Sequence, residues 1–297
     1  MRRVLVLGML LALGALAVAK AQSPAPDAPK VIEVEKVKDN LWVLRGGGGN
    51  TAVFVTAGGV VVVDTKNPGW GQPVLDKIKT LTDKPVTTLI NTHTHGDHVS
   101  GNVAFADAVE VVTHENTKAN MDKMPIFKEN AGRGLPKKTF KDKMTLGKGV
   151  DQIDLYYFGP GHTSGDAWVA FPAHRVVHAG DIFARKSMPF VDGANGGSVV
   201  RYPETLMKAY NGIKNVDTII TGHMPTQTTW ADLKEFAEFN QDFLAFGQAQ
   251  LKAGKTPEQA AAEWKMPAKY TGYSDTVSNL GGGLKGRLEL LATEMKN

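Results

Sequence analysis

Residues 91–102 read NTHTHGDHVSGN and place three of the chain's eight histidines within six positions. The stretch follows a short apolar run rich in β-branched residues, which is typical of a buried strand. Residues i and i+2 of an extended chain project from the same side, so His93 and His95 would face one ligand. Asp97 and His98 follow where we expect the chain to turn into a helix, which redirects their side chains. This short stretch therefore predicts a loop that serves two adjacent metal ions.

Three further candidate ligands follow strand-like runs and adjoin glycine, where irregular backbone lets a side chain reach inward. They are His162 in GPGHTSGD, Asp181 in VVHAGDIF and His223 in IITGHMP. Zinc accepts histidine and carboxylate ligands, and a catalytic zinc keeps one position open for water. The predicted metal ligands are His93, His95, Asp97, His98, His162, Asp181 and His223.

We assign catalytic roles to two of these ligands, Asp97 and Asp181. For the three remaining histidines, His114, His174 and His178, we expect hydrogen-bonded structural roles. The chain has no cysteine, so it has no disulfides and any metal site must use histidine and carboxylate. These residue types predict two zinc ions per chain.

The first 21 residues read as a secretory signal peptide, with Arg2 and Arg3 before an apolar run and a small-x-small site at Ala19-Lys20-Ala21. The run is shorter than the roughly 20 residues that span a bilayer. We therefore expect cleavage after Ala21, a periplasmic or secreted protein and no membrane attachment after cleavage. Cleavage removes three of 34 basic residues, so the net charge falls from +4 towards neutrality. Nucleic acid is then an unsuitable partner, and a small-molecule substrate is expected.

Residues 22–30 are rich in proline and alanine and predict a disordered lead-in, and residues 31–297 predict a single domain. Short strands joined by tight turns run from 31 to 64 and indicate a meander. Strands and helices then alternate, which indicates a layered α/β fold. Residues 121–144 lack periodicity and predict an irregular surface excursion. An apolar stripe after Trp230 predicts a long helix, and Thr256 begins a capping-box pattern for another.

The HTHGDH motif followed by GH, GD and GH, each at the end of a strand, resembles the metallo-β-lactamase superfamily from about Val31 to Trp230. The resemblance implies a four-layer αββα sandwich with the metals at one edge between two sheets. It implies His93, His95 and His162 on a first metal and Asp97, His98 and His223 on a second, with Asp181 bridging both. Asp64, at the end of VVVVD, resembles an aspartate that supports the ligands from behind.

Two positions narrow what the resemblance implies. True metallo-β-lactamases usually carry cysteine or serine where this chain has Asp181, whereas glyoxalase II-like thioesterases and lactonases carry the bridging aspartate. The flavodiiron branch typically has glutamate in place of His95. We therefore expect an exported binuclear zinc hydrolase whose metal-bound hydroxide attacks the carbonyl of an ester, thioester, lactone or amide.

Three alternatives remain from the sequence. A β-lactamase would share the metals and differ in the pocket, a persulfide dioxygenase-like enzyme would use one iron, and a metal-stabilised binding protein would perform no catalysis. The substrate is not determined, because the expected pocket walls are loops, at residues 67–72, 121–146 and 184–201. Trp70 and Phe190 are candidate pocket hydrophobes.

Overall fold

The computed structural model describes residues 30–274 and 279–296, and residues 31 onward form one compact unit. The expected signal peptide, and nearly all of the expected lead-in, lie outside the described residues. Among the helices of the described part, none is long and apolar enough to cross a membrane. The described residues thus fall almost entirely within 31–297, the range for which the sequence predicted a single α/β domain.

The first sheet has seven strands in chain order. Its antiparallel half comprises β1 (Glu33–Lys38), β2 (Leu41–Arg45), β3 (Thr51–Thr56) and β4 (Gly59–Val63). Its parallel half adds β5 (Val86–Ile90), β6 (Glu110–His114) and β7 (Lys138–Phe140). The meander predicted for residues 31–64 is confirmed.

The second sheet has six strands, and its order is β13-β12-β11-β10-β9-β8. The strands are β8 (Lys143–Leu146), β9 (Ile153–Tyr156), β10 (Trp168–Phe171), β11 (Val176–Gly180), β12 (Thr218–Thr221) and β13 (Thr228–Thr229). Only β11 and β12 pair in parallel, and the other neighbours are antiparallel. The parallel pair matters for the site because both strands end at the same edge of the sheet.

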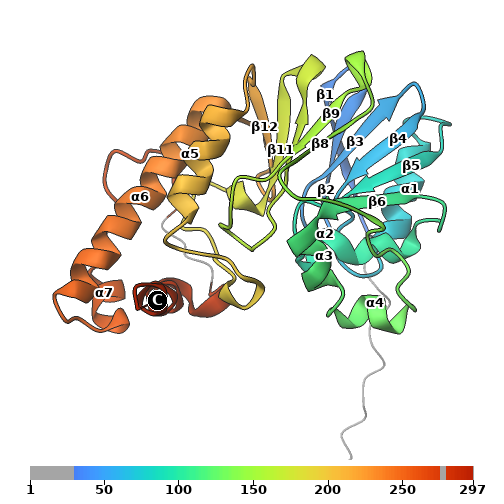
Figure 1. Ribbon diagram of the computed structural model, residues 1–297. Coiled ribbons are helices and arrows are strands. Elements are labelled where there is room, and N and C mark those ends of the chain that lie inside the picture. The colour runs from blue at the N-terminus through green and yellow to red at the C-terminus, as the bar shows by residue number, and fades with distance from the viewer. Residues whose placement is uncertain (1–29, 275–278, 297) are drawn as a thin grey trace, which may run out of the picture. The chain divides into compact units, whose positions relative to one another are not determined.

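Helices cover the outer face of each sheet, which gives the expected αββα layers (Figure 1). Helix α1 (Gly71–Lys79) packs on the first sheet, and at the edge of that sheet α2 (Gly96–Val99), α3 (Glu115–Met121) and α4 (Pro125–Glu129) pack in a small cluster of their own. On the second lie α5 (Tyr202–Gly212) and α6 (Trp230–Lys252), and α7 (Pro257–Glu263) and α8 (Gly283–Glu294) pack against each other and against α6. Short 3-10 turns include Ser100–Ala104 and Asp181–Phe183. The long helix after Trp230 and the capping box at Thr256 are both confirmed.

Strand β4 shows why the two sheets stack. All five of its residues are buried, and successive strand residues point to opposite faces. Val61 and Val63 pack in the cluster between the sheets, whereas Val60 and Val62 pack in the cluster beneath α1. Between the sheets, the rings of Phe54 and Phe171 meet edge to face at 5.1 Å. An apolar run buried on both faces therefore requires a layer on each side.

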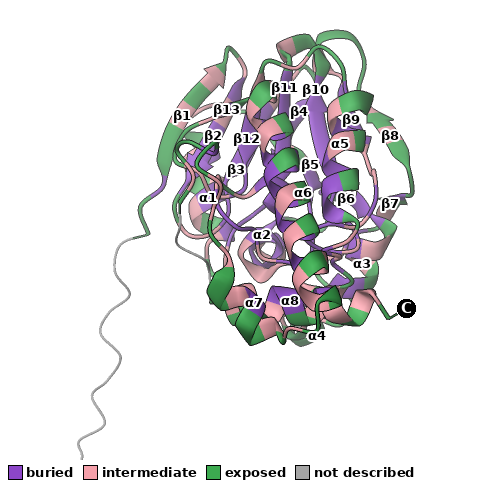
Figure 2. Cartoon of the chain, turned by 90° about the vertical axis from the view of Figure 1, so that its left-hand side faces the viewer, coloured by how far each residue is buried: buried purple, intermediate pink, exposed green. Residues whose placement is uncertain are grey.

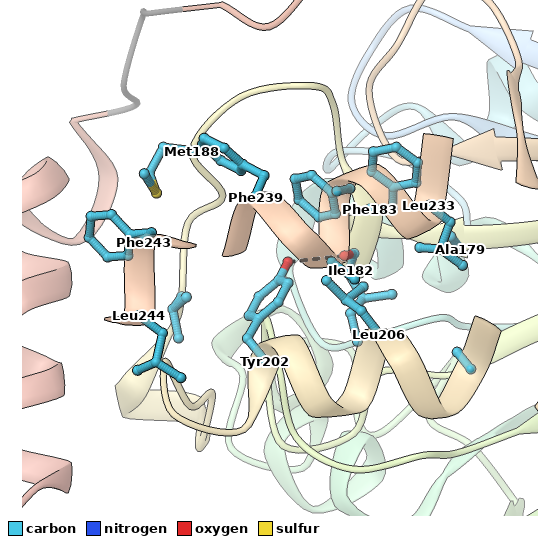
Figure 3. Packing of buried hydrophobic residues seen from close by; sticks show 14 of the residues in the cluster. Ala179, Ile182, Phe183, Met188, Tyr202, Leu206, Leu233, Phe239, Phe243 and Leu244 are labelled. Atoms are coloured by element: carbon cyan, nitrogen blue, oxygen red, sulfur yellow. Dashed lines mark hydrogen bonds between the residues drawn. The ribbon is translucent and has the colours of Figure 1, made fainter. Parts of the chain in front are cut away.

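The largest core cluster lies between the second sheet and the C-terminal helices. Figure 2 shows buried strands behind α5 and α6, whose outer faces are exposed. In Figure 3, Phe183 and Ile182 lie beside Leu206 of α5 and Leu233 of α6, and the Tyr202 hydroxyl donates to the Ile182 carbonyl at 3.0 Å. This packing fixes the 3-10 turn that begins at Asp181.

The prediction of an irregular excursion over residues 121–144 is wrong in part. The segment contains α4 and the strand β7, and it ends in β8, which begins the second sheet. Strand β7 has only three residues and is defined by its parallel pairing with β6, where Val112 faces Lys138. Three residues are too short for a periodic pattern, so only the pairing partner reveals the strand.

Candidate metal centre

The seven predicted ligands come from four chain segments, each after a strand, and meet at one edge of the two sheets. His93 and His95 follow β5, and α2 carries Asp97 and His98. The other three ligands follow strands of the second sheet: His162 comes after β9, Asp181 after β11 and His223 after β12. Strand ends of both sheets thus supply the site, as expected from the parallel segments.

The first group joins three histidines and one carboxylate whose ligand atoms all lie within 4.8 Å of one another: His93, His95, His162 and Asp181. His162 Nε2 lies 2.9 Å from His95 Nδ1 and 3.7 Å from Asp181 Oδ2. His93 Nε2 lies 4.0 Å from the same carboxylate oxygen. Three imidazole nitrogens therefore point at one small volume.

The second group joins Asp97, His98 and His223 within the same 4.8 Å limit. His223 Nε2 lies 3.2 Å from Asp97 Oδ2, and His98 Nε2 lies 3.6 Å from that oxygen. The two histidine nitrogens are 3.4 Å apart. The sequence separates His98 and His223 by 125 positions, and the stacking of the two sheets brings them together.

Asp181 lies between the two groups. Its Oδ1 is 3.2 Å from His98 Nε2, and its Oδ2 is 3.2 Å from His223 Nε2. The backbone beside it must be bare, because a Cβ added to Gly222 would meet Asp181 Oδ1 at 1.8 Å. Glycine before His223 therefore lets the two strand ends approach closely enough to share this carboxylate.

The chemistry of the buried atoms fits metal binding. His93 Nε2 is buried and has no hydrogen-bond partner among the described residues. Burial and the neighbouring histidines hold the pKa of His93 well below its usual range, and burial lowers the pKa of His162 to about 4. Both rings are then neutral at pH 7 and present free lone pairs, which is the form that binds a metal ion.

The second group has the opposite electrostatics before any metal binds. Burial alone would lower the pKa of His98, but the carboxylates of Asp181 and Asp64 outweigh it and hold that pKa well above its usual range. Burial also lowers the pKa of His223, but the hydrogen bonds to Asp181 and Asp97 have the larger effect and raise that pKa to about 9. In the metal-free protein, His98 and His223 are therefore protonated near neutral pH and form ion pairs with these carboxylates.

Asp64 stands behind the second group, where the resemblance implied it. It is fully buried, and its Oδ2 lies 2.7 Å from His98 Nδ1. It also accepts hydrogen bonds from the backbone N–H and the hydroxyl of Thr92, at 2.8 and 2.7 Å. Its φ of 62° is unusual for a residue with a side chain, and the surrounding bonds hold it there.

Two supporting contacts on the first group were missed by sequence reasoning. Asp192 Oδ2 lies 2.8 Å from His95 Nε2, and the Phe190 carbonyl oxygen lies 2.8 Å from His162 Nδ1. Such contacts leave the opposite ring nitrogen free for a metal. Asp192 is 97 positions from its histidine and lies in an ordinary glycine-containing turn, so no local signal marks it.

A buried lysine, also unpredicted, lies beneath the glycine run that borders the second group. The ammonium of Lys66 donates to the carbonyls of Leu44 and Gly49, each at 2.9 Å, and burial lowers its pKa to about 7. Gly49 in turn donates its N–H to the Asp97 carbonyl at 2.9 Å. A Cβ on Gly49 would meet the His98 ring at 2.1 Å.

The three histidines assigned structural roles lie outside both groups. His178 Nε2 contacts the Asn50 carbonyl at 3.0 Å, and His114 Nε2 contacts the Lys141 carbonyl at 2.8 Å. His174 instead packs edge to face on Phe54, and its buried Nε2 has no hydrogen-bond partner among the described residues. The prediction of a hydrogen-bonded His174 is therefore wrong, and packing holds the ring.

A pocket of about 570 Å³ opens onto both groups. Five of the seven ligands line it, together with Ala184, Arg185, the residues 187–190, and the more distant Ser274 and Leu280. The prediction of its walls is thus correct for the first part of 184–201, up to Phe190, and wrong for 191–201, 67–72 and 121–146. Phe190 lines the pocket and stacks on His95 at 5.7 Å, whereas Trp70 packs against the α1 core.

Comparison with known proteins agrees with this geometry. The family model described as "Metallo-beta-lactamase superfamily" matches residues 44–232. The chain belongs to that superfamily. Its members are metal-dependent hydrolases. The metallo-β-lactamase fold predicted from the sequence is confirmed.

Individual superfamily relatives cover most of the chain. A "Metallo-beta-lactamase type 2" from Elizabethkingia meningoseptica is 29% identical over 65% of this chain and 78% of its own length. A metallo-beta-lactamase structure from Pontibacter korlensis has a TM-score of 0.61 at 23% identity, covering 71% of this chain and 99% of that one. A sec-alkylsulfatase structure from Pseudomonas sp. has a TM-score of 0.67 at 16% identity, covering 89% of this chain and 50% of that one. These two structural likenesses describe the fold alone.

Proposed function

We propose that this superfamily member is an exported binuclear zinc hydrolase that cleaves an ester, thioester, lactone or amide. The observation that carries the proposal is the position of Asp181, whose two carboxylate oxygens each lie 3.2 Å from a histidine of the second group while Oδ2 also lies near the first. A carboxylate so placed can contact two ions at once. The other six ligands divide into two groups of three around it.

His93, His95 and His162 would hold one ion, and Asp97, His98 and His223 the other. Two bound zinc ions would supply a Lewis acid for a substrate carbonyl and lower the pKa of a shared water. The chain's own contribution is orientation: the contacts behind His95, His98 and His162 fix which nitrogen of each of these rings faces the site. The pocket beside them presents the half-buried ring of Phe190 to a substrate.

Hydrolysis of β-lactams is the second candidate, because the Elizabethkingia relative is named a metallo-beta-lactamase and is 29% identical. Asp181 argues against it. A bridging carboxylate adds negative charge and occupies space between the ions, so a substrate that carries its own carboxylate is penalised there. Neutral esters and thioesters avoid that repulsion.

The test begins with elemental analysis of the purified mature protein and of His93→Ala, His98→Ala and Asp181→Ala variants. We expect two zinc ions in the wild type and one fewer in Asp181→Ala. His174→Gln, a change at a histidine outside both groups, is the matched control and should retain both ions. One iron without zinc would instead replace the proposal with the dioxygenase alternative.

Activity is then compared on zinc-replete protein near neutral pH. Lactones, aryl esters and thioesters should exceed penicillins, cephalosporins and carbapenems in kcat/KM, and all activities should disappear together in His93→Ala and His98→Ala. Fastest turnover of the lactams would establish the β-lactamase alternative. A fully metallated protein inactive on the whole panel would favour a binding protein.

Export is a separate part of the proposal, supported by the Arg2-Arg3 start and the Ala19-Lys20-Ala21 site. Mass analysis of the N-terminus of protein recovered outside the cytoplasm should find Gln22 as the first residue. A cytoplasmic product that retains the leader would contradict it.

A further inference from the structure

The first metal group depends on a segment that contributes no ligand. Residues 187–200 carry both the Phe190 carbonyl, 2.8 Å from His162 Nδ1, and Asp192, 2.8 Å from His95 Nε2. The same segment donates the Asp192 N–H to the His162 carbonyl at 2.8 Å. The orientation of two of the three histidines therefore follows the position of this segment.

Helix α8 holds this segment at its beginning through a buried arginine. The guanidinium of Arg287 donates Nη1 to the Pro189 carbonyl at 2.7 Å and Nη2 to the Asn240 side-chain oxygen at 2.8 Å. It lies over the rings of Tyr202 and Phe243, at 5.6 and 4.8 Å from their centroids. A planar guanidinium can make contacts in several fixed directions at once, which an ammonium cannot.

The same helix holds the segment at its end through a carboxylate. Glu294 accepts hydrogen bonds from the Ser198 hydroxyl and from the backbone N–H groups of Val199 and Val200, at 2.9, 3.0 and 2.9 Å. Between the two anchors, a Cβ on Gly193 would meet Leu290 of α8 at 2.9 Å. Helix α8 therefore binds the segment 187–200 on both sides of Asp192.

The rest of the C-terminal layer reinforces this arrangement. Asn240 donates its own amide to the Phe236 carbonyl at 2.8 Å, which turns its oxygen towards Arg287. Met188 packs into the same apolar cluster as Phe239 and Phe243, and Figure 3 shows it reaching from the loop towards those rings of α6. Nearly all of α6, and the whole of α7 and α8, lie beyond residue 232, where the superfamily match ends.

We propose that Arg287 and Glu294 are positioning residues for the first metal site, because they fix the segment that orients His95 and His162. The inference rests on the metal centre of the proposed function. Under this proposal, the C-terminal helices beyond the superfamily match affect zinc binding at the first site and leave the adjacent second site unaffected. Within the described part of the chain, the second group has no contact with this segment comparable to that of Asp192. Asp64 and Gly49 support it from the side of the first sheet instead.

The experiment measures the affinity for Zn²⁺ alone at each site by competition with a chromogenic chelator. His223→Ala protein isolates the first site, and His95→Ala protein isolates the second. Arg287→Met and Glu294→Gln are introduced into each background. Lys285→Met is the matched control, because Lys285 is exposed on the same helix and its ion pairs, with Glu258 and Glu289, do not involve the segment 187–200.

Arg287→Met should weaken zinc binding at the first site by about tenfold and leave the second within about twofold, since loss of contacts behind a ligand typically costs about 10–100-fold in affinity. Asp192→Asn should produce a loss of the same kind. Combined with Arg287→Met, it should cost less than the product of the two single losses, because both changes act on one carboxylate. Glu294→Gln, which keeps its shape, decides the matter if Arg287→Met does not fold.

Equal weakening of both sites would show a general effect on folding and overturn the inference. So would unchanged affinity at the first site in folded Arg287→Met and Glu294→Gln proteins. A wild-type protein that binds no zinc would instead overturn the metal centre itself, so the two failures are distinguishable.

Discussion

The carboxylate of Asp64 and the imidazole of His98 lie 2.7 Å apart, and both side chains are fully buried. Because the contact is made at Nδ1, the opposite nitrogen of His98 faces the site, 3.2 Å from Asp181 Oδ1. The strand that ends before Asp64 thereby determines how a ligand from another loop is presented. Carboxylate–histidine pairs of this kind orient ligands and raise their basicity.

Asp64→Asn should therefore weaken zinc binding at the second site by about 10–100-fold. The amide keeps the shape but removes the charge that His98 contacts. The affinity is measured in the His95→Ala background, where only the second site remains. Asp83→Asn, a change at an exposed aspartate, is the control and should have no effect. Unchanged affinity in Asp64→Asn would contradict the orienting role.

Gly49→Ala should damage the same site by a steric route. A Cβ at this position would meet His98 Cε1 at 2.1 Å, so the ring or the glycine run must move. Overpacking of this kind costs about 1–3 kcal/mol of stability. Chemical denaturation and zinc stoichiometry measure the two effects. Gly58→Ala is the matched control, because a Cβ there meets nothing within 4 Å. Equal behaviour of the two alanine variants would rule out the close approach.

The two metal sites should differ in their pH dependence. The pKa of His223 is raised to about 9 and that of His98 lies well above its usual range, so zinc must displace protons from both at pH 7. Affinity at the second site should then rise with pH towards 9, by up to about tenfold per pH unit for each proton released. The comparison is made between pH 6 and 8.

At the first site, the pKa of His162 is lowered to about 4 and that of His93 lies well below its usual range, so these two rings need no deprotonation. The first site, isolated in His223→Ala, should therefore show a shallower slope than the second, isolated in His95→Ala. Identical slopes would show that the carboxylates do not hold protons on the second group.

Lys66 should make stability depend on pH in the alkaline range. Its pKa is lowered to about 7 in the folded protein, whereas an unfolded lysine titrates near about 10.4. Below pH 7 the Lys66 side chain is protonated in both the folded and the unfolded protein, so burying its charge lowers the free energy of unfolding by the full amount. Between those values the unfolded state binds more protons, so this residue's contribution to stability rises by up to about 1.4 kcal/mol per pH unit.

The measurement compares the free energy of unfolding of the wild type and Lys66→Met in chelator between pH 7 and 10. The difference between them should shift in favour of the wild type as pH rises, because methionine does not titrate. A difference that is constant with pH would show that Lys66 keeps an ordinary pKa. Lys77→Met, at the last turn of α1, provides a surface control.

Much of the fold was predictable because local patterns agree with it. The continuous apolar run in VVVVD, the meander before it and the capping box at Thr256 each depend on neighbouring residues in the chain. The seven candidate ligands could also be named, since histidine and aspartate beside glycine after apolar runs are rare together. Strand β7 could not be predicted, because three residues gain their identity only from the strand they pair with.

The sequence by itself determined which side chains could bind metal and where most of the longer strands and helices lie, because residue type and periodicity are local properties. Only the tertiary structure decided what stands behind those ligands. In the sequence Asp192 looks like an ordinary turn residue, and only the folded chain brings it to His95, 97 positions away. Likewise, Arg287 reaches the Pro189 carbonyl only because α8 packs on α6. A hydrogen bond requires two atoms to meet within about 3 Å. For groups so far apart in the chain, that meeting is set by how the layers stack, which no short stretch of sequence contains.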